Sequence, residues 1–139
     1  TIIELNLQRN KIGDDGMQLI SNALRNNTTL TSLNLCSNQI GEQGTQYLTY
    51  ALRNNATLKQ IYLHENHIGD EGVKHLADAL RNNQTLTTLD LEHNEIGDNG
   101  TEYLAEALRD NNTDLIGQTD FILYDTEFVK ISTYMEIVK

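Results

Sequence analysis

Four residues with chemically useful or polar side chains recur at one position of a repeated pattern. They are Gln8, Cys36, His64 and Glu92, each separated from the previous one by the same interval. Thiolate, imidazole and carboxylate groups are the ligands that Zn²⁺ takes in proteins, and a thiol beside a general base is the arrangement of a cysteine nucleophile. The row therefore raises two hypotheses, a zinc site and a thiol-dependent enzyme.

The expected geometry of the row disfavours both hypotheses. Equivalent positions on neighbouring strands lie ~4.8 Å apart, and their side chains run side by side instead of converging on one point. Such a row supplies neither an oxyanion hole nor an enclosed pocket. We therefore predict no metal, no cofactor and no catalytic residue here, and interpret the row as part of a binding face. His67 and His75 are expected to decorate a turn and a helix surface.

The row belongs to a longer repeat whose period is constant along the chain. The pattern apolar-x-Leu-x-x-Asn-x-Ile-Gly-x-x-Gly centres on Asn10, Asn38, Asn66 and Asn94. A fixed period of about 28 residues is typical of a solenoid, in which each unit packs against its neighbours. Within a unit, the apolar spacing changes from alternation at Leu33 and Leu35 to helical spacing from Gly44 onward. Each repeat is therefore predicted to be a strand, a turn and a helix, with the first helix spanning roughly 14–26.

The asparagine column is predicted to be structural. Where the chain turns away from each strand, backbone groups remain that no sheet ladder can satisfy. A buried amide offers two donors and an acceptor, so it can bond these groups in its own turn and in the adjacent repeat. We therefore predict a structural ladder formed by Asn10, Asn38, Asn66 and Asn94.

Recurring polar residues mark the predicted helix ends. Asp14, Asp70 and Asp98 stand at or near the N-caps, where a carboxylate accepts free amide protons and meets the positive end of the helix dipole. Paired asparagines follow the helices, as at Asn26 and Asn27, and suit a left-handed residue at the C-terminal end.

Two glycine columns are also predicted to be structural. The first is predicted to adopt positive φ after the turn, and it comprises Gly13, Gly41, Gly69 and Gly97. The second is predicted to let stacked backbones approach closely, and it comprises Gly16, Gly44, Gly72 and Gly100.

The charge is unevenly distributed along the chain. The formal net charge is −10, yet residues 1–69 hold five acidic and five basic residues while residues 70–139 hold fifteen acidic and five basic ones. Phosphate binding needs clustered Lys and Arg, so nucleic acid is disfavoured as a partner. A solubilising surface is the first interpretation of the acidic half, and an electrostatic bias toward a basic protein partner is the alternative.

Cysteine usage and hydropathy bear on location. The single cysteine, Cys36, disfavours a disulfide-stapled secreted module and favours a reducing compartment. No apolar run approaches the ~20 residues of a membrane span, and no signal-peptide pattern opens the chain. We therefore predict a cytoplasmic protein with no membrane contact.

With these motifs in view, the chain resembles the ribonuclease-inhibitor-like leucine-rich repeats. Four copies such as L-T-S-L-N-L-C-S-N-Q-I-G-E-Q-G-T-Q-Y-L-T-Y-A-L-R-N-N cover residues 1 to about 112. The closest likeness is to the repeat arrays of NOD-like receptors. The resemblance implies a right-handed α/β solenoid, with a concave parallel sheet, convex helices and a recognition or autoinhibitory role without catalysis. Ribonuclease inhibitors, GTPase-activating proteins for Ran and actin-binding tropomodulins are similar in repeat type.

The repeat is predicted to end near residue 114. Residues 1–114 form the predicted repeat domain, and residues 115–139 a degenerate fifth repeat or C-terminal cap, because the register slips after Arg109. Residues 120–124 are expected to form an edge strand, followed by a short helix carrying Ile131, Met135 and Val138 on one face. The apolar first strand, which no polar cap precedes, predicts a fragment of a longer array that is monomeric by itself.

We predict that the chain is a non-enzymatic protein–protein interaction module within a larger protein, with its partner on the concave face. A regulator of a small GTPase, an inhibitor of an enzyme and a structural spacer are the alternatives. The outward strand positions vary while the scaffold repeats, and their richest corner combines an aromatic anchor with charge. The predicted partner-binding residues are Tyr62, His64, Asp90 and Glu92.

Overall fold

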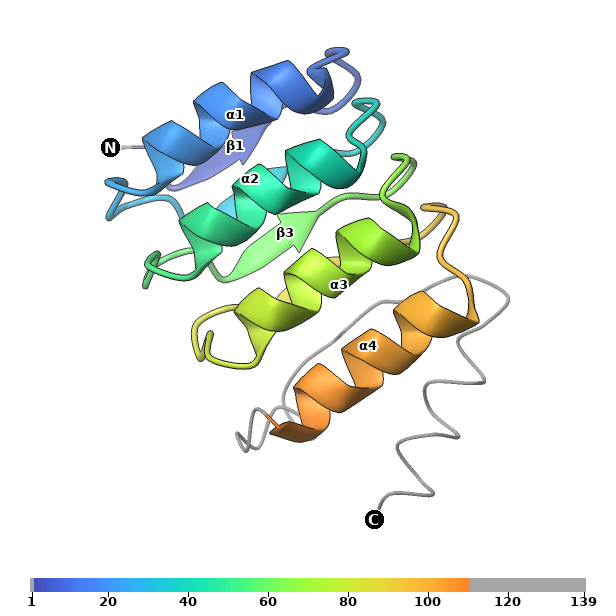
Figure 1. Ribbon diagram of the computed structural model, residues 1–139. Helices are drawn as coiled ribbons and strands as arrows, with labels where there is room; N and C mark the ends of the chain where they lie inside the picture. The colour runs from blue at the N-terminus through green and yellow to red at the C-terminus, as the bar shows by residue number, and fades with distance from the viewer. Residues whose placement is uncertain (1, 111–139) are drawn as a thin grey trace.

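The computed structural model describes residues 2–110, which form four strand–helix units stacked in a row (Figure 1). The units comprise β1 (Glu4–Asn6) and α1 (Gly13–Leu24), β2 (Ser32–Asn34) and α2 (Glu42–Leu52), β3 (Gln60–Tyr62) and α3 (Gly69–Leu80), and β4 (Thr88–Asp90) and α4 (Asp98–Asp110). The strands form a parallel sheet in the order β1-β2-β3-β4, and the helices lie over one of its faces. The predicted α/β repeat solenoid is confirmed over these residues.

The sheet register follows the sequence period. Leu5 pairs with Leu33, Leu33 with Ile61, and Ile61 with Leu89. Each partner lies one full period further along the chain. Residues at the same position of successive repeats, which we call a column, therefore lie side by side across the sheet. This register places the scaffold leucines on the helix side and the variable residues on the opposite side.

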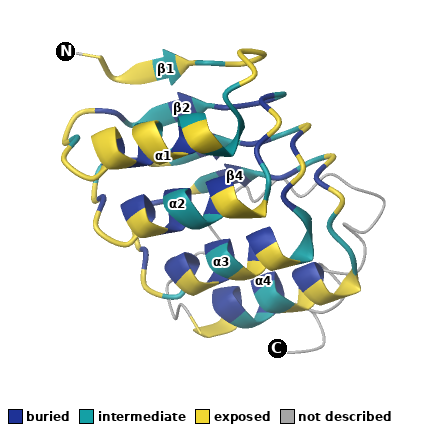
Figure 2. Cartoon of the chain, turned by 45° about the horizontal axis from the view of Figure 1, so that its top comes forward, coloured by how far each residue is buried: buried dark blue, intermediate teal, exposed yellow. Residues whose placement is uncertain are grey.

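The core is a strip between the sheet and the helices (Figure 2). Leu33, Ile61 and Leu89 from the strands and Leu48 and Leu76 from the helices are almost fully buried. Burying one such side chain stabilises the fold by about 1.5–3 kcal/mol. The strip thins at the first repeat, where Leu5 and Leu7 are half-buried and Ile2 and Ile3 are exposed.

The asparagine column closes each turn and links it to its neighbour. The Oδ1 atom of Asn66 accepts hydrogen bonds from the Asn38 and Ile40 amides of the preceding repeat, each at 3.0 Å. Its Nδ2 atom donates to Leu35 O at 3.1 Å and to Leu63 O at 2.7 Å. One side chain thereby satisfies four backbone groups on two repeats.

The same arrangement recurs along the column with one difference at each end. Asn38 accepts from the Asn10 amide at 2.9 Å and donates to Leu7 O at 2.9 Å. Asn10 is exposed and bonds within its own turn. Asn94 donates back to Leu63 O at 2.9 Å, but its Oδ1 accepts no hydrogen bond within the described residues.

A second set of asparagines does comparable work at the other end of the helices. Asn55 donates to Leu24 O at 2.9 Å in the preceding repeat and accepts from the Leu58 amide at 2.8 Å. Asn83 bonds to Leu52 O at 2.9 Å and to the Leu86 amide at 2.8 Å in the same way. The left-handed residue predicted at the paired asparagines is wrong, because these residues do not have positive φ. Their buried side chains hold the turn.

The predicted helix capping is wrong for Asp14 and Asp70, and the bonds that they make instead alternate between repeats. The Oδ1 atom of Asp14 accepts the Gly41 amide of the next repeat at 2.7 Å, and Asp70 accepts the Gly97 amide at 2.7 Å. Neither α1 nor α3 has a side-chain cap bond. The carboxylates therefore join unit one to unit two and unit three to unit four.

The glycine columns follow this alternation. Gly13 and Gly69 adopt φ of 58° and 61°, as predicted, while Gly41 is extended with φ of −105°. Positive φ at Gly41 was therefore a wrong expectation, because its amide points at Asp14 instead. In the second column, a Cβ on Gly100 would lie 3.3 Å from the backbone Cα of Asp70, which matches the predicted close approach, and 2.6 Å from Asp70 Oδ1.

The predicted boundary at residue 114 and the expected strand and helix in 115–139 lie outside the described residues. Within residues 2–110, no helix is long and apolar enough to cross a membrane.

We expect Asn66→Leu to lower the free energy of unfolding by about 1–3 kcal/mol, because it leaves buried backbone groups without partners. Asn10→Leu is the matched control, since Asn10 occupies the same column but faces water. Urea denaturation followed by circular dichroism measures both. Equal stability of wild type and Asn66→Leu would contradict the role assigned to the ladder.

We expect Asp70→Ala to lower the free energy of unfolding by about 1–3 kcal/mol, because the Gly97 amide loses a charged acceptor in a half-buried position. Glu42→Ala is the control, because Glu42 occupies the same column in an even-numbered repeat and is exposed. Thermal and urea unfolding of the two variants should separate them. Similar losses for both would argue against the alternation.

Candidate binding surface on the uncovered face of the sheet

The helices leave one face of the sheet uncovered, and we call it the open sheet face. It consists of the outward residues of the four strands, Glu4, Asn6, Ser32, Asn34, Gln60, Tyr62, Thr88 and Asp90. Those of β1 are exposed and the others are half-buried. None of the eight is apolar apart from the tyrosine ring, so this face is not a core surface left bare.

A shallow depression of about 440 Å³ crosses the first three strands of this face. Its polar lining comprises Glu4, Asn6, Ser32, Asn34, Gln60 and Tyr62. Tyr62 is the aromatic residue of this lining. Of the four predicted partner-binding residues, Tyr62 lies in the depression, and His64, Asp90 and Glu92 lie beyond it.

Asparagine and aspartate at the strand ends fix the backbone that follows them. Asn6, Asn34 and Asp90 each accept, through Oδ1, the amide of the residue two positions later at 3.0 Å. These local turns aim the next outward side chain in each repeat. Tyr62 holds the same column in β3 and lines the depression.

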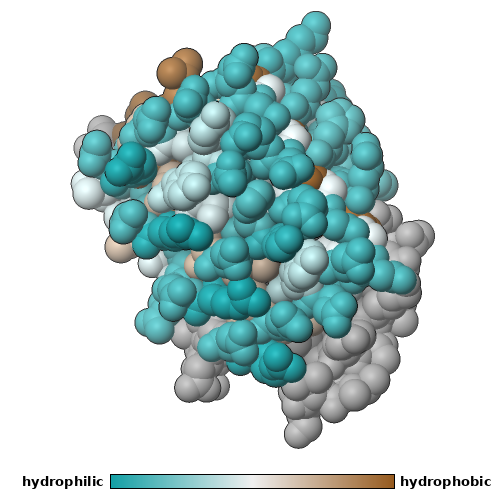
Figure 3. Space-filling model, viewed as in Figure 1, coloured by the Kyte–Doolittle hydropathy of each residue, from teal (hydrophilic) through white to brown (hydrophobic). Residues whose placement is uncertain are grey.

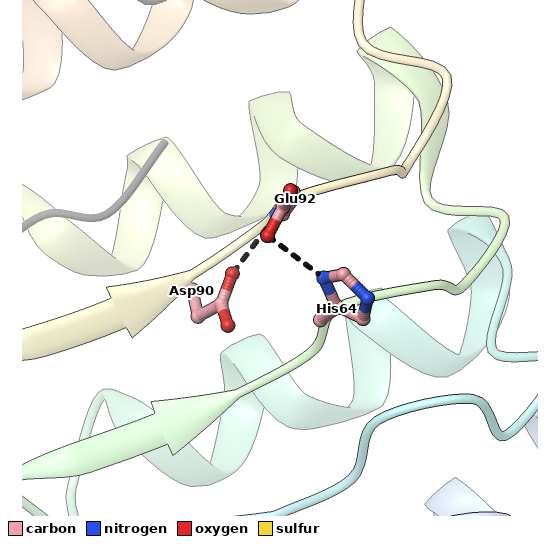
Figure 4. A group of neighbouring side chains, drawn as sticks. All are labelled: His64, Asp90 and Glu92. Atoms are coloured by element: carbon pink, nitrogen blue, oxygen red, sulfur yellow. Dashed lines mark hydrogen bonds and ion pairs between the residues drawn. The ribbon is translucent and has the colours of Figure 1, made fainter. Parts of the chain in front are cut away.

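His64, Asp90 and Glu92 gather at the ends of β3 and β4, where Asp90 is the last residue of β4 (Figure 4). His64 Nδ1 lies 3.1 Å from Glu92 Oε2, and the Glu92 amide donates to Asp90 Oδ1 at 3.0 Å. One ligand atom from each residue lies within 4.8 Å of those of the other two. The expectation that side chains of this row do not converge is therefore wrong for His64 and Glu92. Both follow the strand ends, where the backbone turns and the strict parallel arrangement ceases.

Two turn residues extend this cluster into a chain of polar contacts. Glu65 Oε1 lies 3.7 Å from His64 Nε2, and Glu65 Oε2 accepts the Ser37 hydroxyl at 2.6 Å. The Ser37 hydrogen bond is the main cause that lowers the pKa of the Glu65 carboxyl from its usual value. The nearby imidazole of His64 and guanidinium of Arg9 act in the same direction.

His93 contacts the cluster from its other side. Its Nε2 atom lies 3.4 Å from Glu92 Oε1, and its ring meets that of His64 edge-on at 5.2 Å between centroids. The site residues predicted from the sequence did not include Ser37, Glu65 and His93. All three occupy the position just before the ladder asparagine, and each has φ between 53° and 54°. That shared column was visible in the sequence, but its left-handed backbone was not.

Cys36 takes no part in the cluster. It is 7% exposed, and burial raises the pKa of its thiol above the usual value. A buried thiol with a raised pKa is a poor nucleophile, because little thiolate forms near neutral pH. The Cys36 thiol therefore supports neither hypothesis raised by the row.

The opposite, helical face is mostly hydrophilic (Figure 3). Its hydrophobic colour lies mainly toward α1, where Leu19 is 72% exposed. Exposed ion pairs decorate the helices, such as Lys74 with Glu71 at 3.0 Å. Pairs of this kind add little stability and no specific shape.

The sequence matches a family model described as Leucine Rich repeat over residues 1–21, 26–48, 54–77 and 82–105. The chain belongs to the leucine-rich repeat family. Each of the four matched segments covers one strand and most of the helix that follows it, so the family assignment and the fold rest largely on the same residues. A search of curated proteins found no match.

Two solved structures illustrate the shared fold. A structure of leiomodin-1 actin-binding site 2 superposes with a TM-score of 0.80 at 20% identity, covering 97% of this chain and 77% of that one. The tropomodulin C-terminal domain of Caenorhabditis elegans gives a TM-score of 0.75 at 13% identity, covering 97% and 83%. At these identities the likeness concerns the fold. Neither neighbour shows the closer resemblance to NOD-like receptors.

We expect Cys36 to react with a thiol reagent such as 5,5′-dithiobis(2-nitrobenzoate) far more slowly than free cysteine at pH 8. Its pKa is raised, so the thiolate fraction at a given pH is smaller, and burial blocks access. The rate should rise as pH increases and should approach that of free cysteine in denaturant. Rapid reaction of the folded chain would contradict the assigned environment.

Proposed function

We propose that the chain is a non-enzymatic protein-recognition module whose partner binds the open sheet face, the concave side of the solenoid. The observation that carries the proposal is the contrast between repeat positions that keep the same residue type and outward strand positions that vary. Leucines and asparagines that build the core and the turns repeat along the chain, whereas the outward strand residues vary, as Asn34, Tyr62 and Asp90 do in one column. Variable side chains on a fixed frame are what specific recognition requires.

Tyr62 is the proposed anchor. It stands at the junction between the depression on β1 to β3 and the polar cluster on β3 and β4. A half-buried tyrosine offers a large apolar surface and one hydroxyl at low entropic cost, which is why tyrosine is enriched where interfaces carry most energy.

The charge of this region favours a basic partner segment. Three carboxylates, those of Asp90, Glu92 and Glu65, lie at or just beyond the ends of β3 and β4. Glu4 adds another at the far side of the depression. The region thus offers an aromatic anchor beside acidic groups. A peptide segment with Lys or Arg next to an apolar residue complements that surface.

The area available limits the affinity. Four strands at ~4.8 Å give a sheet about 20 Å wide, which is small against the ~800 Å² per partner of a standard interface. We therefore propose that this segment alone binds weakly and belongs to a larger recognition surface.

Actin binding is a second candidate, favoured by the leiomodin neighbour, whose structure is titled as an actin-binding site. This candidate rests on shared fold, and the chain shares 20% of its residues with that neighbour. A receptor repeat segment and a regulator of a small GTPase remain the other proposals for the parent protein. A purely structural spacer would leave the open sheet face without binding energy.

The experiment is a selection of random displayed peptides on the full chain, performed in EDTA, with purified actin monomers tested in parallel. Affinities are then measured for wild type, Tyr62→Ala and the double variant Asp90→Lys with Glu92→Lys. The control is Asp15→Lys with Glu102→Lys, which makes the same charge change at exposed positions on the helices.

We expect selected peptides rich in Lys and Arg whose binding falls at least about tenfold in both open-face variants, the loss typical of an interface anchor. The helical control should bind like wild type. Loss of binding in the helical control alone would place the partner on the helical face and contradict the proposal. Selection of acidic peptides would contradict the expected basic character of the partner. Actin binding lost in Tyr62→Ala would favour the second candidate.

A further inference from the structure

We propose that His64, Asp90 and Glu92 form a Zn²⁺ site at the edge of the open sheet face. The inference goes beyond the proposed recognition function, because the zinc site needs no protein partner. His64, Asp90 and Glu92 belong both to this site and to the proposed partner-binding residues. It rests on the convergence of one imidazole and two carboxylates from adjacent repeats (Figure 4).

The donor atoms are close to the spacing that a zinc ion requires. Zn–N and Zn–O bonds of about 2.0–2.2 Å at tetrahedral angles place neighbouring donors roughly 3.3 Å apart. His64 Nδ1 and Glu92 Oε2 already stand 3.1 Å apart. The Asp90 donor lies within 4.8 Å of both, so a small side-chain rotation brings it into the same shell.

Neighbouring residues hold each donor in the orientation that ligation needs. The Glu92 amide donates to Oδ1 of Asp90 at 3.0 Å, a bond that does not use the other carboxylate oxygen. The second ring nitrogen of His64 faces the Glu65 carboxylate at 3.7 Å, and Ser37 holds that carboxylate through a 2.6 Å hydrogen bond. A carboxylate behind a histidine fixes the tautomer and strengthens the metal bond in known zinc sites.

His93 supports the third donor. Its Nε2 atom lies 3.4 Å from Glu92 Oε1, the oxygen that does not face His64. In the proposed site, Glu92 binds the ion through Oε2 while His93 holds Oε1. Three protein ligands leave a fourth position for water or for a side chain of another molecule.

The donor set selects zinc over the common hard cations. Mg²⁺ and Ca²⁺ prefer shells made of oxygen, whereas imidazole suits Zn²⁺. The described part of the chain also contains two simpler pairs, His67 with Glu95 at 3.1 Å and His75 with Glu42 at 3.9 Å. Neither pair belongs to a group of three convergent donors within residues 2–110. His67 is therefore a natural control for an exposed imidazole beside a carboxylate.

The chain itself supplies substitutions that the fold accepts. Asp90→Asn copies Asn6 and Asn34, which occupy the same column and accept the same amide hydrogen bond. His64→Gln and Glu92→Gln both copy Gln8, the first member of their column. Each variant removes one donor while keeping a side chain that another repeat already carries.

The experiment is isothermal titration of ZnCl₂ into the full chain without a histidine tag, with MgCl₂ titrated separately. Wild type, His64→Gln, Asp90→Asn, Glu92→Gln and the control His67→Gln are compared, and circular dichroism in EDTA checks that each is folded. Nitrogen-15 NMR of the imidazoles reports in parallel whether Nδ1 of His64 binds the metal.

We expect one saturable zinc site per chain, no comparable magnesium binding, and a shift of the His64 Nδ1 resonance. Each of the three ligand variants should weaken zinc binding at least about tenfold, while His67→Gln should leave it unchanged. Absence of a saturable site in wild type would overturn the proposal, and so would zinc binding as tight in the three ligand variants as in wild type. Loss of binding in His67→Gln equal to that in His64→Gln would also overturn it. Peptide binding in EDTA tests recognition separately, so either proposal can fail alone.

Discussion

The rest of the structure depends on the hydrogen bonds made by the ladder asparagines. After each strand the backbone turns toward a helix, and the turn buries amide and carbonyl groups that no strand can pair. Asn38 and Asn66 satisfy those groups in their own repeat and in the one before. A buried donor or acceptor without a partner is costly, so the amide makes a sharp turn compatible with a buried core. The turn, the register and the stacking of repeats are therefore fixed together.

This arrangement leaves the side chains of the open sheet face free of core packing. Core leucines point to the helices, and asparagine and aspartate side chains form hydrogen bonds to backbone groups of adjacent repeats. Outward residues such as Gln60 and Tyr62 lie on the side away from that core. The same frame also carries the polar cluster, because it brings the strand ends of adjacent repeats into register. His64 and Glu92 meet for that reason, although a full repeat separates them in the sequence.

The features that recur with the repeat period could be predicted from the sequence. The strand–turn–helix unit, the parallel register and the columns of the open sheet face follow from positions that recur once in every period. The actual first helix, Gly13–Leu24, ends two residues before the predicted limit near 26. The alternation between odd and even repeats was not predicted. One repeat position carries Asp14 and Asp70 in the odd-numbered repeats and Glu42 and Asp98 in the even-numbered ones. A shared period describes the chain's path, but which amide a carboxylate reaches depends on local backbone angles.

The same limit applies to the candidate site. The sequence placed His64, Asp90 and Glu92 on neighbouring strand ends and predicted that the row would stay parallel. It could not show that the turns after Tyr62 and Asp90 tilt these side chains together, nor that Glu65 and His93 adopt positive φ beside them. Side-chain convergence depends on small rotations of the backbone that residue type does not specify. The roles proposed for these residues stay predictions.

The central claim is that a fixed frame presents its recognition chemistry on the open sheet face. Hydrogen–deuterium exchange with and without a selected basic peptide tests this claim most directly, because it reports where the backbone is protected. The account predicts slower exchange in segments 60–65 and 88–93 and in the turns beside them, with unchanged exchange in α2, α3 and α4. Protection confined to the helices, with no change in those strand segments, would contradict it.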